Sequence, residues 1–145
     1  MRTIVILVIA IAYTIPIQVV AEPEYHLCTA EGVVNRACLR DMLQKNDTQV
    51  NKLFDAAIMN LQAEKHEYDL ISHPDETDRQ MTKWLDQRIK HLEATQPAYL
   101  NFRKAICDAS QHAFEGGSYS YTVGMNCLIQ QSELRLQWLN DFYAK

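Results

Sequence analysis

The sequence predicts an all-α fold, a small antiparallel bundle of three main helices stapled by two local disulfides. Apolar residues recur every three or four positions along three long segments, which is the spacing of one helix face. The four glycines and four prolines fall mostly outside these segments. Strand-like alternation is confined to residues 119–123, and no internal repeat is present.

Residues 1–21 have the features of a cleavable secretory signal peptide. A minimal basic start precedes an uninterrupted apolar run at 4–12, and Ala21 is a small residue suited to signal peptidase. A retained membrane anchor is the alternative, but the run is too short to span a bilayer comfortably and Pro16 interrupts the residues after it. We therefore expect cleavage after Ala21, a single helical domain at 22–145, a periplasmic or secreted location, and no membrane insertion after cleavage.

The first helix is predicted at about residues 35–64, where no glycine or proline interrupts the apolar spacing. Its inner stripe comprises Leu39, Leu43, Asn46, Val50, Leu53, Phe54, Ala57, Ile58 and Leu61. A polar stretch follows, and His73-Pro74 within it is a turn signal. Asp75 or Thr77 is expected to cap the next helix.

The second helix is predicted at about residues 78–113 and contains Pro97. A proline removes a backbone hydrogen bond and commonly bends a helix. The segment is therefore either one helix kinked at Pro97 or two helices, the second of them capped by Thr95.

The third helix follows a strong stop signal, Gly116-Gly117. It is expected to begin at Ser118 or Ser120, either of which suits a cap, and to run to about Phe142. Its inner stripe comprises Tyr121, Met125, Leu128, Ser132, Arg135, Leu136, Leu139 and Phe142.

The chain contains four cysteines. An even number in a secreted chain indicates disulfides, and four cysteines allow three pairings. We favour the two local pairs, Cys28–Cys38 and Cys107–Cys127, because each closes a short loop and the second spans a predicted helical hairpin. The cysteines are not in close pairs and no histidine lies at zinc-finger spacing from them, so we expect no metal and no cofactor.

One stripe of the second helix mixes polar and apolar side chains. At i, i+4, i+7, i+11 and i+15 it carries Leu92, Gln96, Tyr99, Arg103 and Cys107. An arginine is costly to bury alone, so we expect Arg103 to pair with Asp47 from the first helix or Glu133 from the third. The sequence thus predicts a structural polar cluster of Gln96, Tyr99, Arg103, Asp47 and Glu133. The alternative is that Arg103 is a binding hot spot.

These residues resemble the LprI-type lysozyme-inhibitor family, whose pattern reads roughly Leu-x3-Gln-x2-Trp-x3-Arg-Asp-x2-Cys, then Gly-Gly-Ser, Cys and Thr-x2-Arg. The resemblance covers about residues 28–142 and includes the upstream run Asn46-Asp47-x3-Asn51-x2-Phe54. Three positions depart from the pattern: Tyr99 replaces Trp, Ser132 replaces Thr, and Lys104 replaces Asp, which reverses a charge. The resemblance implies a secreted bacterial helical domain that inhibits lysozyme.

No residue pattern points to catalysis. No nucleophile is paired with a base, and no two carboxylates occur in a context typical of glycosidases. His66, Asp69 and His73 share a helical spacing that would suit a metal, but Pro74 is close enough to break it. We therefore expect a binding protein rather than an enzyme.

The charge balance fits a protein partner. The chain has a net charge of −4, and loss of the signal peptide with Arg2 leaves thirteen basic against eighteen acidic residues. An acidic domain is unsuited to nucleic acid, whereas it can steer a cationic protein such as lysozyme toward itself. A mildly acidic surface that serves only solubility is the alternative.

The segment between the second and third helices has the composition of a recognition loop. Tyrosine and serine supply rigid aromatic area and adaptable hydrogen bonds. The residues expected to bind the partner are Glu115, Ser118, Tyr119, Ser120 and Tyr121. The leading hypothesis is a lysozyme inhibitor that occludes the enzyme's active-site cleft. The alternatives are an immunity protein against a secreted effector, or an envelope protein with no lysozyme role. The oligomeric state is left open.

Overall fold

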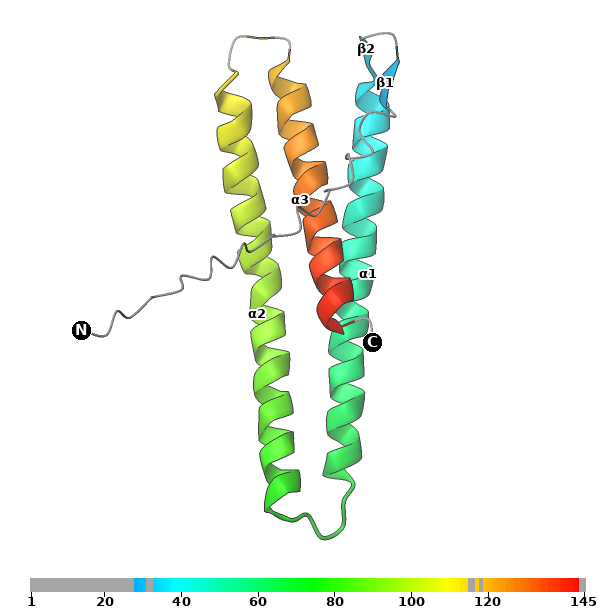
Figure 1. Ribbon diagram of the computed structural model, residues 1–145, viewed down its shortest axis with the longest axis vertical. Helices are drawn as coiled ribbons and strands as arrows, with labels where there is room; N and C mark the ends of the chain where they lie inside the picture. The colour runs from blue at the N-terminus through cyan, green and yellow to red at the C-terminus, as the bar shows by residue number, and fades with distance from the viewer. Residues whose placement is uncertain (1–27, 31–32, 115–116, 118, 144–145) are drawn as a thin grey trace, which may run out of the picture.

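The computed structural model describes residues 28–30, 33–114, 117 and 119–143, so the predicted signal peptide lies outside the described residues. Three long helices make up most of this part of the chain (Figure 1). The elements in chain order are β1 (Thr29–Ala30), β2 (Val33–Val34), α1 (Arg36–Asp69), α2 (Glu76–His112) and α3 (Ser120–Tyr143). The predicted all-α bundle is therefore confirmed.

The long helices α1 and α2 form an antiparallel hairpin, and α3 packs against both of them (Figure 1). At 24 residues α3 is shorter than its 34- and 37-residue neighbours. It starts where α2 ends and stops partway along the hairpin, so the end of the hairpin that carries the α1–α2 turn has no third helix beside it.

The first helix is longer than its periodicity predicted. It continues past Glu64 to Asp69, where Lys65 Nζ donates to Asp69 Oδ2 at 2.8 Å within the last turn. Such an i, i+4 pair supports a helix even where apolar residues are sparse. The apolar pattern ended early because residues 64–69 contribute little to the core, not because the helix ends there.

The starts of α1 and α2 are capped by an amide and an acidic side chain. Asn35 Oδ1 accepts hydrogen bonds from the backbone N–H groups of Ala37 and Cys38 at 3.0 and 3.1 Å. Asp75 caps α2 in a reciprocal capping box with Asp78, each side chain accepting from the other's backbone N–H. Of the two predicted caps for this helix, Asp75 is therefore the one used.

We expect Asp75→Ala to lower the free energy of unfolding by about 1 kcal/mol, because the first turn of α2 loses its capping acceptor. Thr77→Ala is the matched control, since Thr77 is an exposed residue inside the same turn and should cost less than about 0.5 kcal/mol. Urea unfolding of both variants measures the difference. Equal losses would show that the capping box contributes nothing.

The third helix begins at Ser120, one of the two starts that the sequence predicted. The alternating stretch at 119–123 is not a strand, since residues 120–123 form the first turn of α3. Five residues are too few to separate a period of two from a helical period, and packing on α1 and α2 decides for the helix. The strands that the structure does show are β1 and β2, an antiparallel pair of two residues each that the sequence did not signal.

Pro97 does not divide the second segment, because α2 is one helix from Glu76 to His112. Thr95 lies inside it rather than at a cap, and its hydroxyl donates to the Leu92 carbonyl at 2.7 Å. A proline removes a single backbone hydrogen bond. Buried residues on both sides of it, Leu92 and Cys107, keep the two halves of α2 packed on the bundle.

The apolar core is split into two parts along the bundle axis. The larger cluster consists of Val50, Ala57, Leu61, Leu85, Ile89, Leu92 and Leu139. The smaller cluster consists of Cys28, Leu39, Met125 and Ile129. Asp47 of α1 and Ser132 of α3 each fall in sequence between members of the two clusters, which places a polar layer between them.

Candidate functional site

The polar layer is centred on Arg103 of α2, which contacts both neighbouring helices. Its Nη2 donates to Asp47 Oδ2 of α1 at 3.1 Å, and its Nη1 donates to Asp47 Oδ1 and, at 2.7 Å, to Ser132 Oγ of α3. The Ser132 hydroxyl in turn lies 2.9 Å from Asp47 Oδ1. A two-pronged arginine–carboxylate pair is the strongest hydrogen-bond geometry available to these side chains. It ties all three helices together at one level.

The Arg103–Asp47 pair is only partly shielded from water. The side chain of Arg103 is 13% exposed and that of Asp47 is 35% exposed. Burial alone would lower the pKa of the Arg103 guanidinium, but hydrogen bonds and electrostatic interactions with Asp47 and Tyr99 outweigh it and raise the pKa. Arg103 is therefore held in its charged form, as an ion pair requires.

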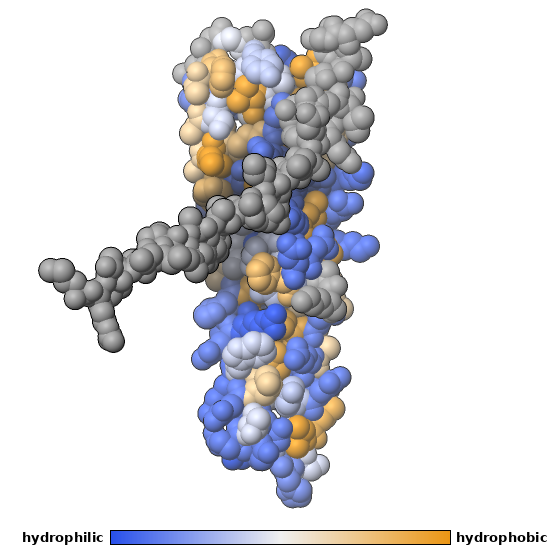
Figure 2. Space-filling model, in the orientation of Figure 1, coloured by the Kyte–Doolittle hydropathy of each residue, from blue (hydrophilic) through white to orange (hydrophobic). Residues whose placement is uncertain are grey.

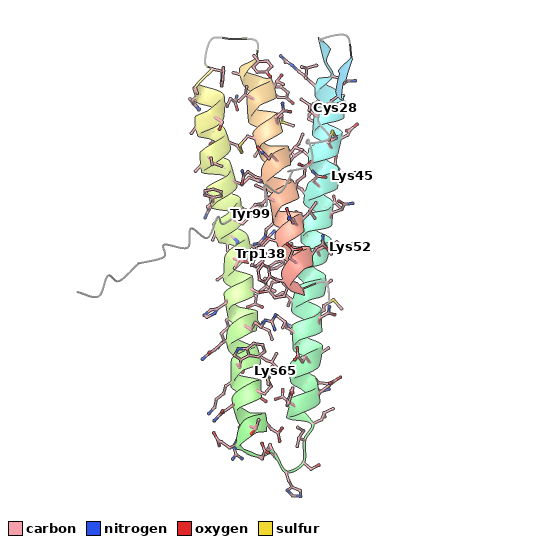
Figure 3. All side chains as sticks on the ribbon, in the orientation of Figure 1. Cys28, Lys45, Lys52, Lys65, Tyr99 and Trp138 are labelled. Atoms are coloured by element: carbon pink, nitrogen blue, oxygen red, sulfur yellow. A yellow bond between two sulfur atoms is a disulfide. The ribbon has the colours of Figure 1, made fainter. Side chains whose placement is uncertain are left out.

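A second arginine, Arg135 of α3, completes the layer and was not predicted as a member. One of its Nη atoms donates to Thr95 Oγ1 at 2.7 Å and to Gln96 Oε1 at 3.0 Å. Burial lowers the pKa of Arg135 below its ordinary value. Its guanidinium lies over the rings of Tyr99 and Trp138, at 5.2 and 4.5 Å from their centroids; both residues are labelled in Figure 3. Its position three residues after Ser132 on the inner stripe was the signal available in the sequence.

Gln96, Tyr99, Arg103 and Asp47, all predicted for the polar cluster, lie together in this layer. Tyr99 Oη accepts from Arg103 at 3.3 Å, and Gln96 Nε2 donates to Asn51 Oδ1 at 3.4 Å. Glu133 is half-buried on α3, one residue after Ser132. Asp47, one of the two carboxylates offered by the sequence, pairs with Arg103.

The layer has the chemistry of a hydrogen-bond network that joins helices. Its groups are two cations, one carboxylate, amides and hydroxyls that are mostly hydrogen-bonded to one another. Among the described residues, the buried Nε of Arg135 is the atom of this layer without a hydrogen-bond partner. Among the described residues there is no group of three or more His, Cys, Asp or Glu side chains placed to hold a metal ion.

Both predicted disulfides are present, Cys28–Cys38 and Cys107–Cys127. The first joins the chain ahead of β1 to the first turns of α1, and the second joins the last turns of α2 to α3. The Cα atoms are 5.5 and 5.4 Å apart, within the range typical of unstrained bridges. The second bridge holds the α2–α3 connection in place.

That connection presents an exposed aromatic pair, which we call the aromatic tip: Phe114 and Tyr119. Phe114 is 50% exposed and Tyr119 is 55% exposed, and their rings meet edge to face with centroids 6.3 Å apart. In Figure 2, hydrophobic residues are visible at this end of the bundle. The sequence interpretation missed Phe114, although an aromatic residue directly after a helix and before two glycines was a usable signal.

The other residues of the predicted recognition loop have different positions. Glu115 and Ser118 lie outside the described residues. Ser120 is the first residue of α3 and is half-buried. Tyr121 packs against the smaller core cluster, with the Arg36 guanidinium 4.8 Å from its ring centroid. Of the described loop residues, Tyr119 therefore offers the most exposed side chain for a partner.

A family model described as "Lysozyme inhibitor LprI" matches residues 28–139, from the first cysteine to the last buried leucine of α3. The chain belongs to the LprI lysozyme-inhibitor family. The resemblance predicted from the Gln–Tyr–Arg–Cys stripe is thereby confirmed over most of the chain. No curated protein and no solved structure matches this LprI-family chain.

Membership has two direct consequences for this LprI-family protein. The family is one of inhibitors rather than catalysts, so its function is expected in binding. The two disulfides, together with the family, indicate a protein that works outside the cytoplasm. None of the helices in the described residues is long and apolar enough to cross a membrane.

Proposed function

We propose that this protein is a periplasmic or secreted inhibitor that binds lysozyme and occludes its active-site cleft, with the aromatic tip as the central contact. The observation that carries the proposal is the family match, which links the chain to lysozyme inhibition. The structure supplies a surface suited to such a role at the α2–α3 connection.

The tip has the properties of an interface hot spot. Tyrosine is enriched among residues that dominate binding energy, because a large ring is buried at the cost of few rotatable bonds. The edge-to-face contact between Phe114 and Tyr119 limits the freedom of both rings before binding. The Cys107–Cys127 bridge, which joins the two helices that flank the tip, adds further preorganisation, and preorganised contacts lose less entropy on binding.

Charge supports a cationic partner. The mature domain would carry a net charge near −5, which favours fast encounter with a basic enzyme at low ionic strength. Glu115 and Ser118, which lie in sequence between the two tip aromatics, are proposed to contact the rim of the cleft. The aromatic rings would then fill the space that a sugar ring occupies in the enzyme.

We expect Phe114→Ala and Tyr119→Ala each to weaken lysozyme inhibition by about fivefold or more, the effect of losing an aromatic anchor. The measurement is lysis of bacterial cell walls by several lysozymes in the presence of the purified 22–145 domain. Phe102→Ala is the matched control, because Phe102 is also 55% exposed but lies on α2 well away from the tip. All three variants should melt like the parent domain.

Two results would count against the proposal in different ways. Absence of inhibition by the parent domain at micromolar concentration, for every lysozyme tried, would remove the function itself. Inhibition that survives both tip substitutions but is lost with Phe102→Ala would keep the function and move the contact surface to the side of α2.

A further inference from the structure

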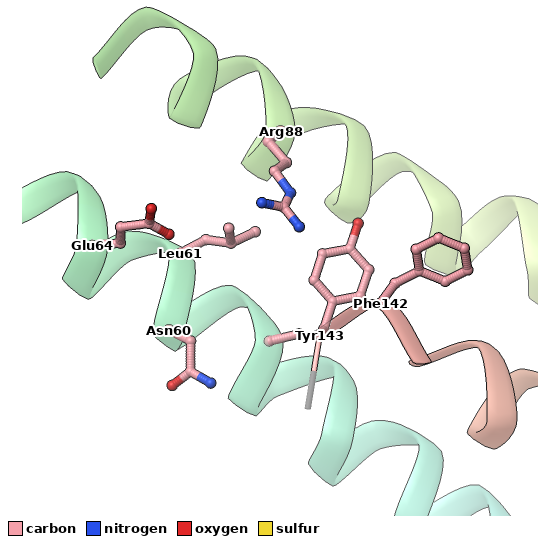
Figure 4. A pocket seen from close by; sticks show the side chains of 7 residues that line it. Asn60, Leu61, Glu64, Arg88, Phe142 and Tyr143 are labelled. Atoms are coloured by element: carbon pink, nitrogen blue, oxygen red, sulfur yellow. The ribbon is translucent and has the colours of Figure 1, made fainter. Parts of the chain in front are cut away.

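A cavity of about 260 Å³ lies where α3 ends against the α1–α2 hairpin (Figure 4). It lies where α3, which is shorter than its neighbours, ends at Tyr143; among the described residues no helix covers the hairpin beyond this point. The lining residues are Ala57, Asn60, Leu61, Glu64, Arg88, Phe142 and Tyr143. The cavity is at the opposite end of α3 from the aromatic tip, roughly 35 Å away along a 24-residue helix.

Arg88 is the residue of this cavity whose hydrogen-bond donors could bind a ligand. Its half-buried guanidinium lies over the rings of Trp84 and Tyr143, at 5.0 and 5.4 Å from their centroids. Within the described part of the chain, no carboxylate lies within ion-pair distance of it. The aromatic rings hold the guanidinium in place without occupying its hydrogen-bond donors. Those donors match the two oxygens of a carboxylate.

The rest of the cavity is suited to an apolar group. Leu61 and Ala57 are buried members of the larger core cluster and supply an apolar floor from α1. Tyr143 of α3 approaches Arg88 of α2 above this floor, so an aromatic ring and a cation face the same space (Figure 4). Asn60 and Glu64 add polar atoms on the α1 side. The lining is about half polar and half apolar, which suits a small molecule with one charged end and one apolar end.

We propose that this cavity binds a small organic acid, whose carboxylate pairs with Arg88 while a ring or short aliphatic group rests on Leu61 and Tyr143. The volume lies just below the ~300–1,000 Å³ of drug-sized sites, which fits a small molecule rather than a folded partner. The proposal goes beyond lysozyme inhibition, because the site shares no residue with the aromatic tip.

The test uses a matched pair of probes, hydrocinnamate and its uncharged amide, which differ only in the carboxylate. Calorimetric titration of the mature domain should show saturable binding of the acid and at least about tenfold weaker binding of the amide. Two-dimensional NMR provides a second measurement, because both tryptophans of the chain border the site. Trp84 contacts Arg88, and Trp138 stacks with Phe142 and Tyr143. Both indole N–H resonances should shift with the acid.

Variants distinguish an effect of the Arg88 guanidinium from an effect of the positive charge on α2 in general. Arg88→Gln should weaken binding of the acid about tenfold or more, since a charged hydrogen-bond donor is lost. Lys90→Gln removes one positive charge from an exposed position of the same helix and should leave binding unchanged. Glu64→Gln should strengthen binding, because the neighbouring negative charge is removed. Arg88→Lys keeps the charge and should bind more weakly than the parent.

The proposal is overturned by any of three results. These are no saturable binding up to ~10 mM acid, equal binding of acid and amide, or undiminished binding by an Arg88→Gln domain whose thermal melt shows that it is folded. Lysozyme inhibition should be the same for Arg88→Gln and the parent domain. A negative result for acid binding at this cavity therefore does not contradict the proposed lysozyme inhibition, and a negative result for inhibition does not contradict acid binding.

Discussion

Replacing Arg103 with alanine should lower the free energy of unfolding by about 2–4 kcal/mol. The substitution leaves the Asp47 carboxylate and the Ser132 hydroxyl without their shared donor in the middle of the bundle. Losing one partner of a fully buried pair costs about 3–5 kcal/mol. We expect less here because the Asp47 side chain is 35% exposed and water can replace part of the lost hydrogen bonding. Denaturant unfolding followed by circular dichroism measures the change.

Lys104→Ala is the matched control for this experiment. Lys104 is the next residue along α2, its side chain is 77% exposed, and it pairs with Asp108 on the surface of the same helix. Its loss should change stability by less than about 0.5 kcal/mol. A double-mutant cycle with Asp47→Ala should give a coupling energy above about 1 kcal/mol, since both residues serve one network.

The same variant tests the division between structural core and binding surface. An Arg103→Ala domain that is as stable as the parent but no longer inhibits lysozyme would contradict the structural role. If Tyr119→Ala also inhibited normally, the contact surface would lie on the helix face around Gln96 and Arg103. The α2–α3 connection would then be only a turn.

Removing the Cys107–Cys127 bridge by a double serine substitution should destabilise the domain by about 3 kcal/mol. The bridge closes a 20-residue separation, and in the chain-entropy model most of its effect comes from restricting the unfolded chain. Inhibition should weaken as well, even at temperatures where the variant stays folded. The reason is that the aromatic tip lies between the two bridged helices and loses preorganisation.

The matched control is a double serine substitution at Cys28 and Cys38. This bridge closes a 10-residue separation and should contribute slightly less, about 2.5 kcal/mol. It joins residues at the start of the described chain and does not link α2 to α3, so inhibition should be retained. Thermal melts and cell-wall lysis assays on both variants compare the two bridges. Equal loss of inhibition in both would mean that overall stability, and not the geometry of the tip, governs binding.

Features that depend on local spacing could be predicted from the sequence. The three helices follow from apolar residues at intervals of three and four, and both disulfides follow from cysteines separated by short loops. The need for a partner for Arg103 also followed from its place on an inner stripe. A buried guanidinium is too costly to leave unpaired, whichever carboxylate supplies the pair.

The sequence by itself therefore determined the helices and the presence of a polar layer, and it favoured the two local bridges among three possible pairings. Only the tertiary structure decided that Asp47 pairs with Arg103, that Arg135 joins the layer, and that Pro97 lies in an unbroken helix. It also decided which loop aromatic is exposed. α3 begins at Ser120, so the next residue, Tyr121, turns toward the core while Tyr119 stays outside beside Phe114. These outcomes depend on how three helices are rotated and staggered against one another, and spacing along one helix carries no information about that.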